Sequence, residues 1–298
     1  MVNIIGHKKI FLSISGFLVL CSIAAVVVFG LKPGIDFTGG VLWNVSFSDT
    51  SVTPDMVSSF LVDQGIQEEV VQKELTSDSF LIRMPLTSEQ DHQTYKNALK
   101  ERFGSFDELR FESIGPTIGA QLKSKSIEAA IFVLLAISLY IAFSFRKVSY
   151  PVKSWKYGII TLGTLFHDVM IPVGVLAVLG HFLGIEIDTN FIVALLVIMG
   201  FSVHDTIVVF DRIRENVLSL GGKSSFSETV NVSVNQTIAR SINTSFTLVL
   251  VLAAMLIVGA TSLKLFVLIM LIGTVMGTYS SIFIASPLLT FWSKAGKN

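Results

Sequence analysis

The chain has 298 residues, of which 51% are hydrophobic and 15% are charged, with 22 acidic and 22 basic side chains. Soluble globular proteins carry about 25% charged residues. The composition therefore excludes an ordinary soluble protein and indicates an integral membrane protein. A single cysteine, Cys21, excludes an intramolecular disulfide and a cysteine-based metal site.

The first apolar run covers residues 10–31 and follows two basic residues, Lys8 and Lys9. Its length of roughly 20 residues is enough to cross a bilayer core of about 30 Å. A secretory signal also begins with basic residues, but its apolar core is shorter and ends at a small-x-small cleavage site. This run ends in Phe-Gly-Leu-Lys-Pro-Gly, so we expect an uncleaved transmembrane helix.

Residues 34–121 have the composition of a soluble domain. Between Lys32 and Lys125 lie 14 of the 22 acidic and nine of the 22 basic residues. Alternating apolar residues and capping signals predict the order βαββαβ of a ferredoxin-like unit. We expect strands at residues 41–47, 70–75, 79–84 and 108–114, and helices at residues 53–64 and 88–103. The domain shows no catalytic constellation, and His92 is expected to be solvated on a polar helix face.

A bundle of five further spans is expected within residues 126–291, at residues 126–145, 155–179, 189–211, 241–259 and 263–291. Six spans place both termini on one side of the membrane. Most basic residues outside the α/β domain fall on that side, whereas the short opposite loops contain only Lys264. By the positive-inside rule, both termini and the loop at residues 212–232 are cytoplasmic, and the α/β domain is extracytoplasmic.

Two charged residues stand out among the apolar segments. Asp205 lies within a predicted span, seven residues before Arg212, or roughly 10 Å deep at ~1.5 Å per residue. A carboxylate there costs about 2.5–3.5 kcal/mol on insertion scales, and such residues usually face a bundle interior or a water path. Arg240 begins the next apolar run and reaches a similar depth if its helix starts near Ser233. We therefore predict that Asp205 and Arg240 form a coupling pair in an ion-driven membrane protein.

Polar residues recur every three or four positions around Arg240, which predicts a polar stripe along one helix face. Asp205 has polar neighbours on its own helix, and Asp168 lies inside the preceding span. The residues expected to support the pair are Ser202, Thr206, Gln236, Asn243, Thr244 and Asp168. The stripe itself contains Ser233, Gln236, Thr237, Arg240, Asn243, Thr244 and Thr247.

Structural interpretations of the same residues stay open. Arg240 is an interfacial cation reaching lipid headgroups if its span begins only at Ser241. Asp205 could be a structural carboxylate hydrogen-bonded between helices. Gly273 and Gly277 favour close helix packing, and the adjacent residues 279–281 are interpreted as interhelical hydrogen bonding.

His167-Asp168 and His204-Asp205 repeat the same dipeptide in neighbouring spans. A metal-dependent phosphohydrolase built on such pairs needs further histidines. Only three others remain, and none is spaced as in HExxH. We therefore expect no enzyme activity, no bound metal and no cofactor.

Several long motifs, in the right order and over nearly the whole chain, resemble those of the SecF family. SecF is the smaller subunit of the bacterial SecD–SecF accessory complex of the Sec protein-export channel. The similar segments are GIDFTGG (34–40), ESIGPTIGAQL (112–122), HDVMI (167–171), DTIVVFDRIREN (205–216), NQTIARSINTS (235–245) and GTYSSIFIASPL (277–288). The family is distantly related to the RND exporters, which implies a six-span half assembled pseudosymmetrically with SecD.

The resemblance implies a protein of the bacterial inner membrane that uses the proton-motive force to promote preprotein translocation or release. Asp205 matches the family's intramembrane aspartate, and Arg240 matches its arginine in the following span. His204 departs from the pattern, because SecF sequences often carry Asn there. The motif residues expected to act as a hinge are Gly34, Asp36, Gly39 and Gly40. The implied partners are SecD, the SecYEG channel, YajC, translocating preproteins and the lipid bilayer, with no nucleic acid.

Two other functions compete with this interpretation. An RND-type proton-coupled transporter half would move a small molecule or lipid, but its porter domains are much larger than the α/β domain expected here. An assembly scaffold would use Asp205 and Arg240 only to hold spans together. The residues also leave open whether the coupling ion is H⁺ or Na⁺, because one carboxylate serves either.

Overall fold

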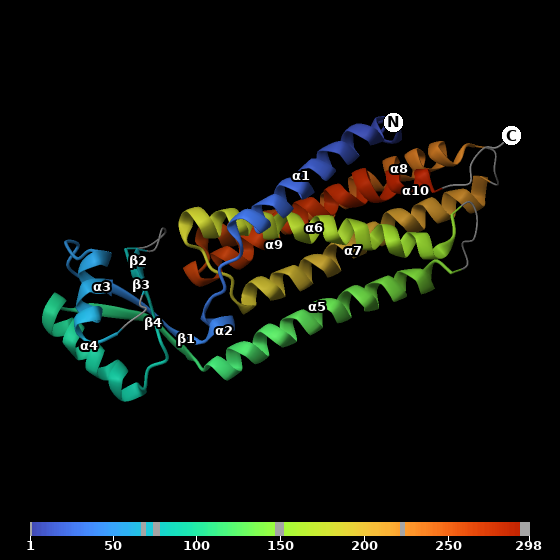
Figure 1. Ribbon diagram of the computed structural model, residues 1–298. Coiled ribbons are helices and arrows are strands. Elements are labelled where there is room, and N and C mark those ends of the chain that lie inside the picture. The colour runs from blue at the N-terminus through green and yellow to red at the C-terminus, as the bar shows by residue number, and fades with distance from the viewer. Residues whose placement is uncertain (1, 67–69, 74–77, 147–151, 221–223, 293–298) are drawn as a thin grey trace. The chain divides into compact units, whose positions relative to one another are not determined.

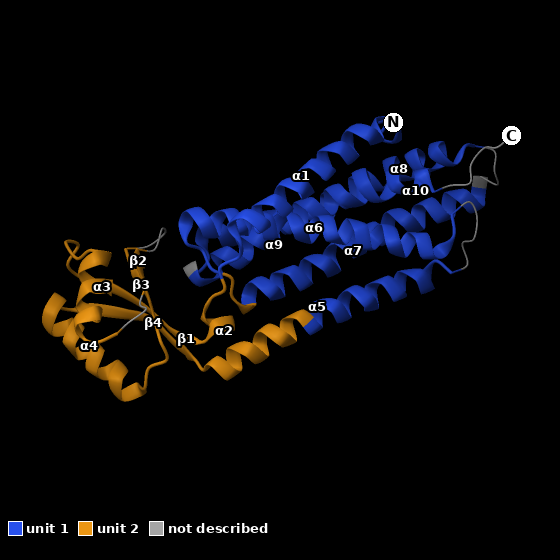
Figure 2. Cartoon of the chain, viewed as in Figure 1, with its two compact units in different colours: residues 1–32, 128–186, 190–298 blue, residues 33–127, 187–189 orange. Residues whose placement is uncertain are grey.

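The computed structural model describes residues 2–66, 70–73, 78–146, 152–220 and 224–292. The chain forms two compact units, shown in different colours in Figure 2. Unit 1 contains residues 1–32, 128–186 and 190–298, and unit 2 contains residues 33–127 and 187–189. Unit 1 is built from long apolar helices, whereas unit 2 is built around a small sheet (Figure 1).

Unit 2 contains a four-stranded antiparallel sheet with the strand order β2-β3-β1-β4. Two helices connect its strands in the chain order βαββαβ (Figure 1). These elements are β1 (Gly40–Phe47), α3 (Pro54–Asp63), β2 (Val70–Lys73), β3 (Phe80–Met84), α4 (Glu89–Phe103) and β4 (Phe106–Ile114). The prediction of a ferredoxin-like unit carried by a helical membrane protein is confirmed.

Alternation along β1 explains how this unit folds. Val41, Trp43 and Val45 are fully buried and belong to the same core as Leu61 of α3 and Leu99 of α4. Successive side chains of a strand point to opposite faces, so both helices cover one face of the sheet. The expected N-cap at the start of α3 is confirmed, because the Thr53 hydroxyl accepts from the N–H of Met56.

The interpretation of His92 as a solvated side chain is wrong. Its ring is 3% exposed and stacks on Phe111 with 3.7 Å between ring centroids. Its Nε2 atom lies 3.1 Å from Oε2 of Glu108. His92 precedes Leu99 by seven residues, which is close to two helical turns, so both face the sheet. The buried face of α4 was not predicted from the sequence because this helix has few apolar residues.

Unit 1 contains six helices that are long and apolar enough to cross a membrane, among the residues described. The chain is therefore a multi-pass membrane protein, as expected. Its helices are α1 (Lys8–Phe29), α5 (Pro116–Ser144, whose first residues belong to unit 2), α6 (Ser154–Leu183), α7 (Thr189–Leu220), α8 (Phe226–Val258) and α9 (Lys264–Ser280). A π-helical turn, Ser281–Ala285, joins α9 to α10 (Ser286–Phe291).

Helices α7 and α8 both extend into the segment 212–232 that was expected to be a loop. Helix α7 continues to Leu220, and α8 begins at Phe226 rather than near Ser241. The Ser225 hydroxyl caps α8 by accepting from the N–H of Glu228. Because no breaker follows, the helix runs without interruption through Arg240 to Val258.

Small residues allow α9 to approach α7 closely. A Cβ atom built on Gly277 would lie 3.0 Å from Cβ of Ser202, and one built on Gly273 would overlap Ile198. The predicted packing role of these two glycines is confirmed. The contact places the end of α9 beside the polar middle of α7.

Candidate functional site

Asp205 lies in the middle of α7 and is only 6% exposed. Its Oδ2 atom accepts a hydrogen bond of 2.8 Å from the hydroxyl of Ser281, the first residue of the π-helical turn. One turn away on α7 itself lie Ser202 and Val208, one polar and one aliphatic. The structure thus places a carboxylate inside the helical unit with one serine hydroxyl as its hydrogen-bond donor.

Asp168 is a second carboxylate in unit 1, at the middle of α6, and its exposure is 0%. Its Oδ1 atom lies 2.8 Å from Nδ1 of His167. Its Oδ2 atom accepts from the hydroxyls of Ser202, at 2.5 Å, and Ser280, at 2.6 Å. Residues from α6, α7 and α9 therefore meet at one buried carboxylate.

Consecutive serines at the end of α9 connect the two carboxylates. Ser280 donates to Asp168, and Ser281 donates to Asp205. They lie where the α-helix changes to a π-helical turn, a feature that frequently marks functional sites. The interpretation of residues 279–281 as interhelical hydrogen bonding is confirmed for both serines, but the sequence did not predict that their acceptors are the two carboxylates. Their position directly after the close α7–α9 contact was the signal that could have linked them to Ser202.

Arg240 is exposed on α8. Among the described residues, its guanidinium makes no ion pair with Asp205, whose one hydrogen-bond donor is Ser281. The predicted pair is therefore not in direct contact within this chain.

The predicted single polar stripe of α8 is divided between two faces. Ser233 and Thr237 are buried, and Ser241 and Ser245 continue this inner row at steps of four. The outer row is exposed and contains Gln236, Arg240, Asn243, Thr244 and Thr247. Each residue turns the helix by about 100°. A residue three positions after a buried one therefore lies about 60° away around the helix, on the exposed side.

The other expected supporting residues have partners of their own. The Thr206 hydroxyl donates to the carbonyl of Ser202 at 3.1 Å, within α7. The side-chain oxygen of Gln236 accepts from Arg212 at 2.7 Å and from Asn216 at 2.8 Å, which ties α8 to α7. Neither residue contacts Asp205 by a hydrogen bond in the described structure. His204 is exposed on α7.

The GIDFTGG segment forms a one-turn helix, α2 (Ile35–Thr38), in unit 2. Asp36 Oδ2 accepts from both the N–H of Thr189, at 2.7 Å, and the Thr189 hydroxyl, at 2.5 Å. The N–H of Gly34 donates to the carbonyl of Ile187 at 2.8 Å. The motif therefore caps the first residue of α7, which carries Asp205 farther along.

The backbone conformation at the end of this segment requires two glycines. Gly39 and Gly40 have φ angles of 78° and 121°, a region that residues with side chains rarely occupy. A Cβ atom on Gly39 would lie 2.8 Å from Cα of Pro116, where α5 begins. One motif thus packs against the start of α5 and caps the start of α7, all within unit 2.

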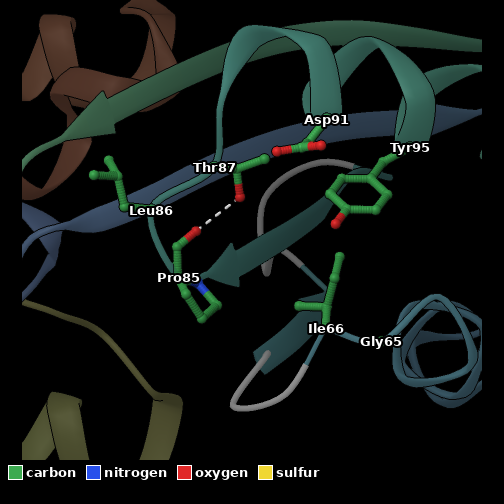
Figure 3. A pocket seen from close by; sticks show the side chains of 7 residues that line it. All are labelled: Gly65, Ile66, Pro85, Leu86, Thr87, Asp91 and Tyr95. Carbon is green, nitrogen blue, oxygen red and sulfur yellow. Dashed lines mark hydrogen bonds between the residues drawn. The ribbon is translucent and has the colours of Figure 1, made fainter.

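Unit 2 contains a hollow on the side of α4 and the end of β3 (Figure 3). It has a volume of about 410 Å³ and is lined by Gly65, Ile66, Pro85, Leu86, Thr87, Asp91 and Tyr95. The one carboxylate among these residues, Asp91, accepts from the hydroxyl of Ser88 at 2.6 Å, at the N-terminus of α4. The Thr87 hydroxyl donates to the carbonyl of Pro85 at 2.9 Å. These groups stabilise local turns and form no reactive set.

Comparison with known proteins places this arrangement in a family. Residues 94–295 match the family model described as "Protein export membrane protein SecD/SecF, C-terminal", and residues 24–50 match the "SecD/SecF GG Motif". The protein translocase subunit SecF of Thermobaculum terrenum is 43% identical over 98% of this chain and 94% of its own. SecF of Anaerolinea thermophila is 36% identical, with the same coverage of both chains.

Solved structures of SecDF match the fold as well. The crystal structure of SecDF from Thermus thermophilus aligns with a TM-score of 0.85 and 31% identity over 98% of this chain. A SecDF structure in a super-membrane-facing form aligns with a TM-score of 0.69 at the same identity and coverage. This chain spans 38% of the length of each SecDF chain.

Proposed function

We propose, because the chain belongs to the SecF family of protein translocase subunits, that it assists the Sec translocase by coupling an ion gradient to preprotein movement. It works with SecD beside the SecYEG channel, with YajC as a further partner. The relatives are named as protein translocase subunits. Their names favour this role over a small-molecule or lipid transporter.

The observation that carries the coupling proposal is the buried carboxylate of Asp205. It lies inside a continuous apolar helix and accepts from Ser281. An ionisable residue in a membrane span is expensive and usually marks an ion path or relay. Moving one elementary charge through a membrane potential of 100 mV yields ~2.3 kcal/mol, which is enough to bias a conformational equilibrium about 50-fold.

Arg240 is the cation of the proposed coupling pair, and it lies on the outer face of α8. A cation and several polar side chains on the exposed side of an apolar helix require partners inside a membrane. In this proposal, helices of SecD cover that face. Protonation of Asp205 removes its attraction for Arg240, and release of the proton restores the attraction and draws the two residues together.

The extracytoplasmic movement follows from the connections of unit 2. In the proposed topology, both termini lie in the cytoplasm of a bacterial cell and unit 2 lies outside the inner membrane. The basic residues flanking the spans support this topology. In this proposal, the sheet and its two helices move about Gly34–Gly40 and Gly115–Gly119, the segments that flank them in the chain. A solved SecDF structure is described as a super-membrane-facing form, which supports movement in this proposal.

The test compares export rates in vesicles that contain this chain, its SecD partner and the Sec channel. An imposed proton gradient should accelerate export with the wild type but not with Asp205→Asn, at equal assembly. Asp211→Asn is the matched control, because it changes an exposed carboxylate on the same helix that pairs with Arg214 at the surface. Replacing the proton gradient with a sodium gradient identifies the coupling ion. Equal acceleration of wild type and Asp205→Asn would refute the proposal.

A further inference from the structure

The coupling proposed above does not use the most deeply buried carboxylate among the described residues of unit 1. Asp168 has no exposed surface, and its two oxygens contact His167, Ser202 and Ser280. A carboxylate of this kind in an apolar interior is costly unless it is paired or neutralised. The arrangement of its partners indicates how this carboxylate is neutralised.

His167 is the ionisable group in direct contact with Asp168. Its side chain is 4% exposed, and Nδ1 lies 2.8 Å from Oδ1 of Asp168. A neutral imidazole that donates from Nδ1 leaves Nε2 as a proton acceptor, and Nε2 is buried with no hydrogen-bond partner. With a neutral imidazole and an ionised carboxylate, the His167–Asp168 dyad has a net charge of −1 and one basic nitrogen, Nε2, without a hydrogen-bond partner. A proton bound at Nε2 forms an N–H bond and makes the dyad neutral.

Few other ionisable groups reach this part of the bundle. Helix α7 contributes Asp205. Helix α9 contributes Tyr279, whose ring lies 6.2 Å from that of His167 and whose hydroxyl donates to the carbonyl of Phe11 at 3.3 Å. Residues 10–29 of α1, residues 129–144 of α5 and all of α10 contain no acidic or basic residue. Helix α8 carries Arg240, which is exposed on its outer face. The dyad and Asp205 are therefore the principal buried ionisable groups of these elements.

The two sites share the elements that hold them. Ser202 donates to Asp168 and lies one helical turn before Asp205 on α7. Ser280 donates to Asp168, and the next residue, Ser281, donates to Asp205. A change of charge at one carboxylate acts on the other through the electric field and through these serines, because like charges disfavour each other's ionisation.

We propose that His167 and Asp168 form a second proton-binding site, coupled to Asp205 through Ser202 and the Ser280–Ser281 pair. Its role in export rests on the proposed function, whereas proton binding rests on the geometry of the dyad alone. A proton at one site favours release from the other. The bundle then alternates between two charge distributions without holding two buried negative charges.

Infrared difference spectroscopy tests this site directly. The chain is labelled with isotopic histidine and reconstituted with its SecD partner in liposomes, and spectra are compared between alkaline and acidic pH. The wild type should show an imidazolium signal that is lost in His167→Gln. In Asp168→Asn and in Asp205→Asn, the signal should differ from that of the wild type, because each change removes a negative charge near the imidazole. Asp91→Asn, an exposed carboxylate in unit 2, should leave it unchanged.

The outcomes separate this inference from the proposed function. Identical spectra for wild type and His167→Gln would overturn proton binding at the dyad, whatever the export assay gives. An unchanged His167 signal in Asp205→Asn would overturn the coupling between the sites. If Asp168→Asn does not assemble, His167→Gln still decides proton binding. If the His167 signal is present but Asp205→Asn exports normally, the dyad still binds a proton. Only its role in export is then refuted.

Discussion

Replacing Asp36 with alanine should loosen the start of α7. The Asp36 carboxylate accepts from the N–H and the hydroxyl of Thr189, so Asp36→Ala removes both bonds. Loss of an N-cap costs about 1 kcal/mol, and a hydrogen bond to a charged group contributes about 1.5–3 kcal/mol. Because Asp36 is partly exposed, we expect a combined loss of about 2 kcal/mol.

Amide hydrogen exchange measures this loss where it occurs. A local loss of about 2 kcal/mol corresponds to roughly 30-fold faster exchange in the first turns of α7. Thr189→Val keeps the backbone bond and removes only the hydroxyl bond, so its effect should be intermediate. Asp55→Ala changes an exposed carboxylate in the first turn of α3 and should leave α7 unaffected. Unchanged exchange at the start of α7 in Asp36→Ala would show that the cap does not stabilise this helix.

Three further changes have defined results. Burial raises the pKa of Glu108, but the effects of Lys96, Trp43 and His92 are larger together and hold it below its usual 4.5. Glu108 therefore stabilises unit 2 above pH 4.5, and this stability is lost as the pH falls through the lowered pKa. Glu108→Gln should therefore show a flatter dependence of Tm on acidic pH. Gly39→Ala should lower the free energy of unfolding by more than the ~1–2 kcal/mol that a left-handed residue costs, because the new Cβ atom also collides with Pro116. Gly65 has a φ of 86° but no atom close to an added Cβ, so Gly65→Ala is the control that measures the backbone cost alone. Denaturant unfolding measures both. Asn231→Ala removes the oxygen that accepts from the N–H groups of Ile4 and Ile5, and the amide group that donates to the carbonyl of Val2. It should accelerate hydrogen exchange at the amides of Ile4 and Ile5, and unchanged rates there would contradict this.

The sequence determined the elements of this protein, because their signals are local. Long apolar runs predict the spans, alternation predicts the strands, and side-chain caps such as Thr53 and Ser88 mark helix starts. These signals depend on residues a few positions apart. The unfavourable position of Asp205 is also readable from its apolar neighbours alone.

The tertiary structure decided which polar side chains meet. Asp168 and Ser280 are 112 residues apart in the chain, and Asp36 and Thr189 are 153 apart, so no local pattern connects them. The rotation of each helix is equally non-local. Arg240 points outward and His92 inward because packing against neighbouring elements selects the buried face, and a helix carrying polar residues on several sides does not specify that face by itself.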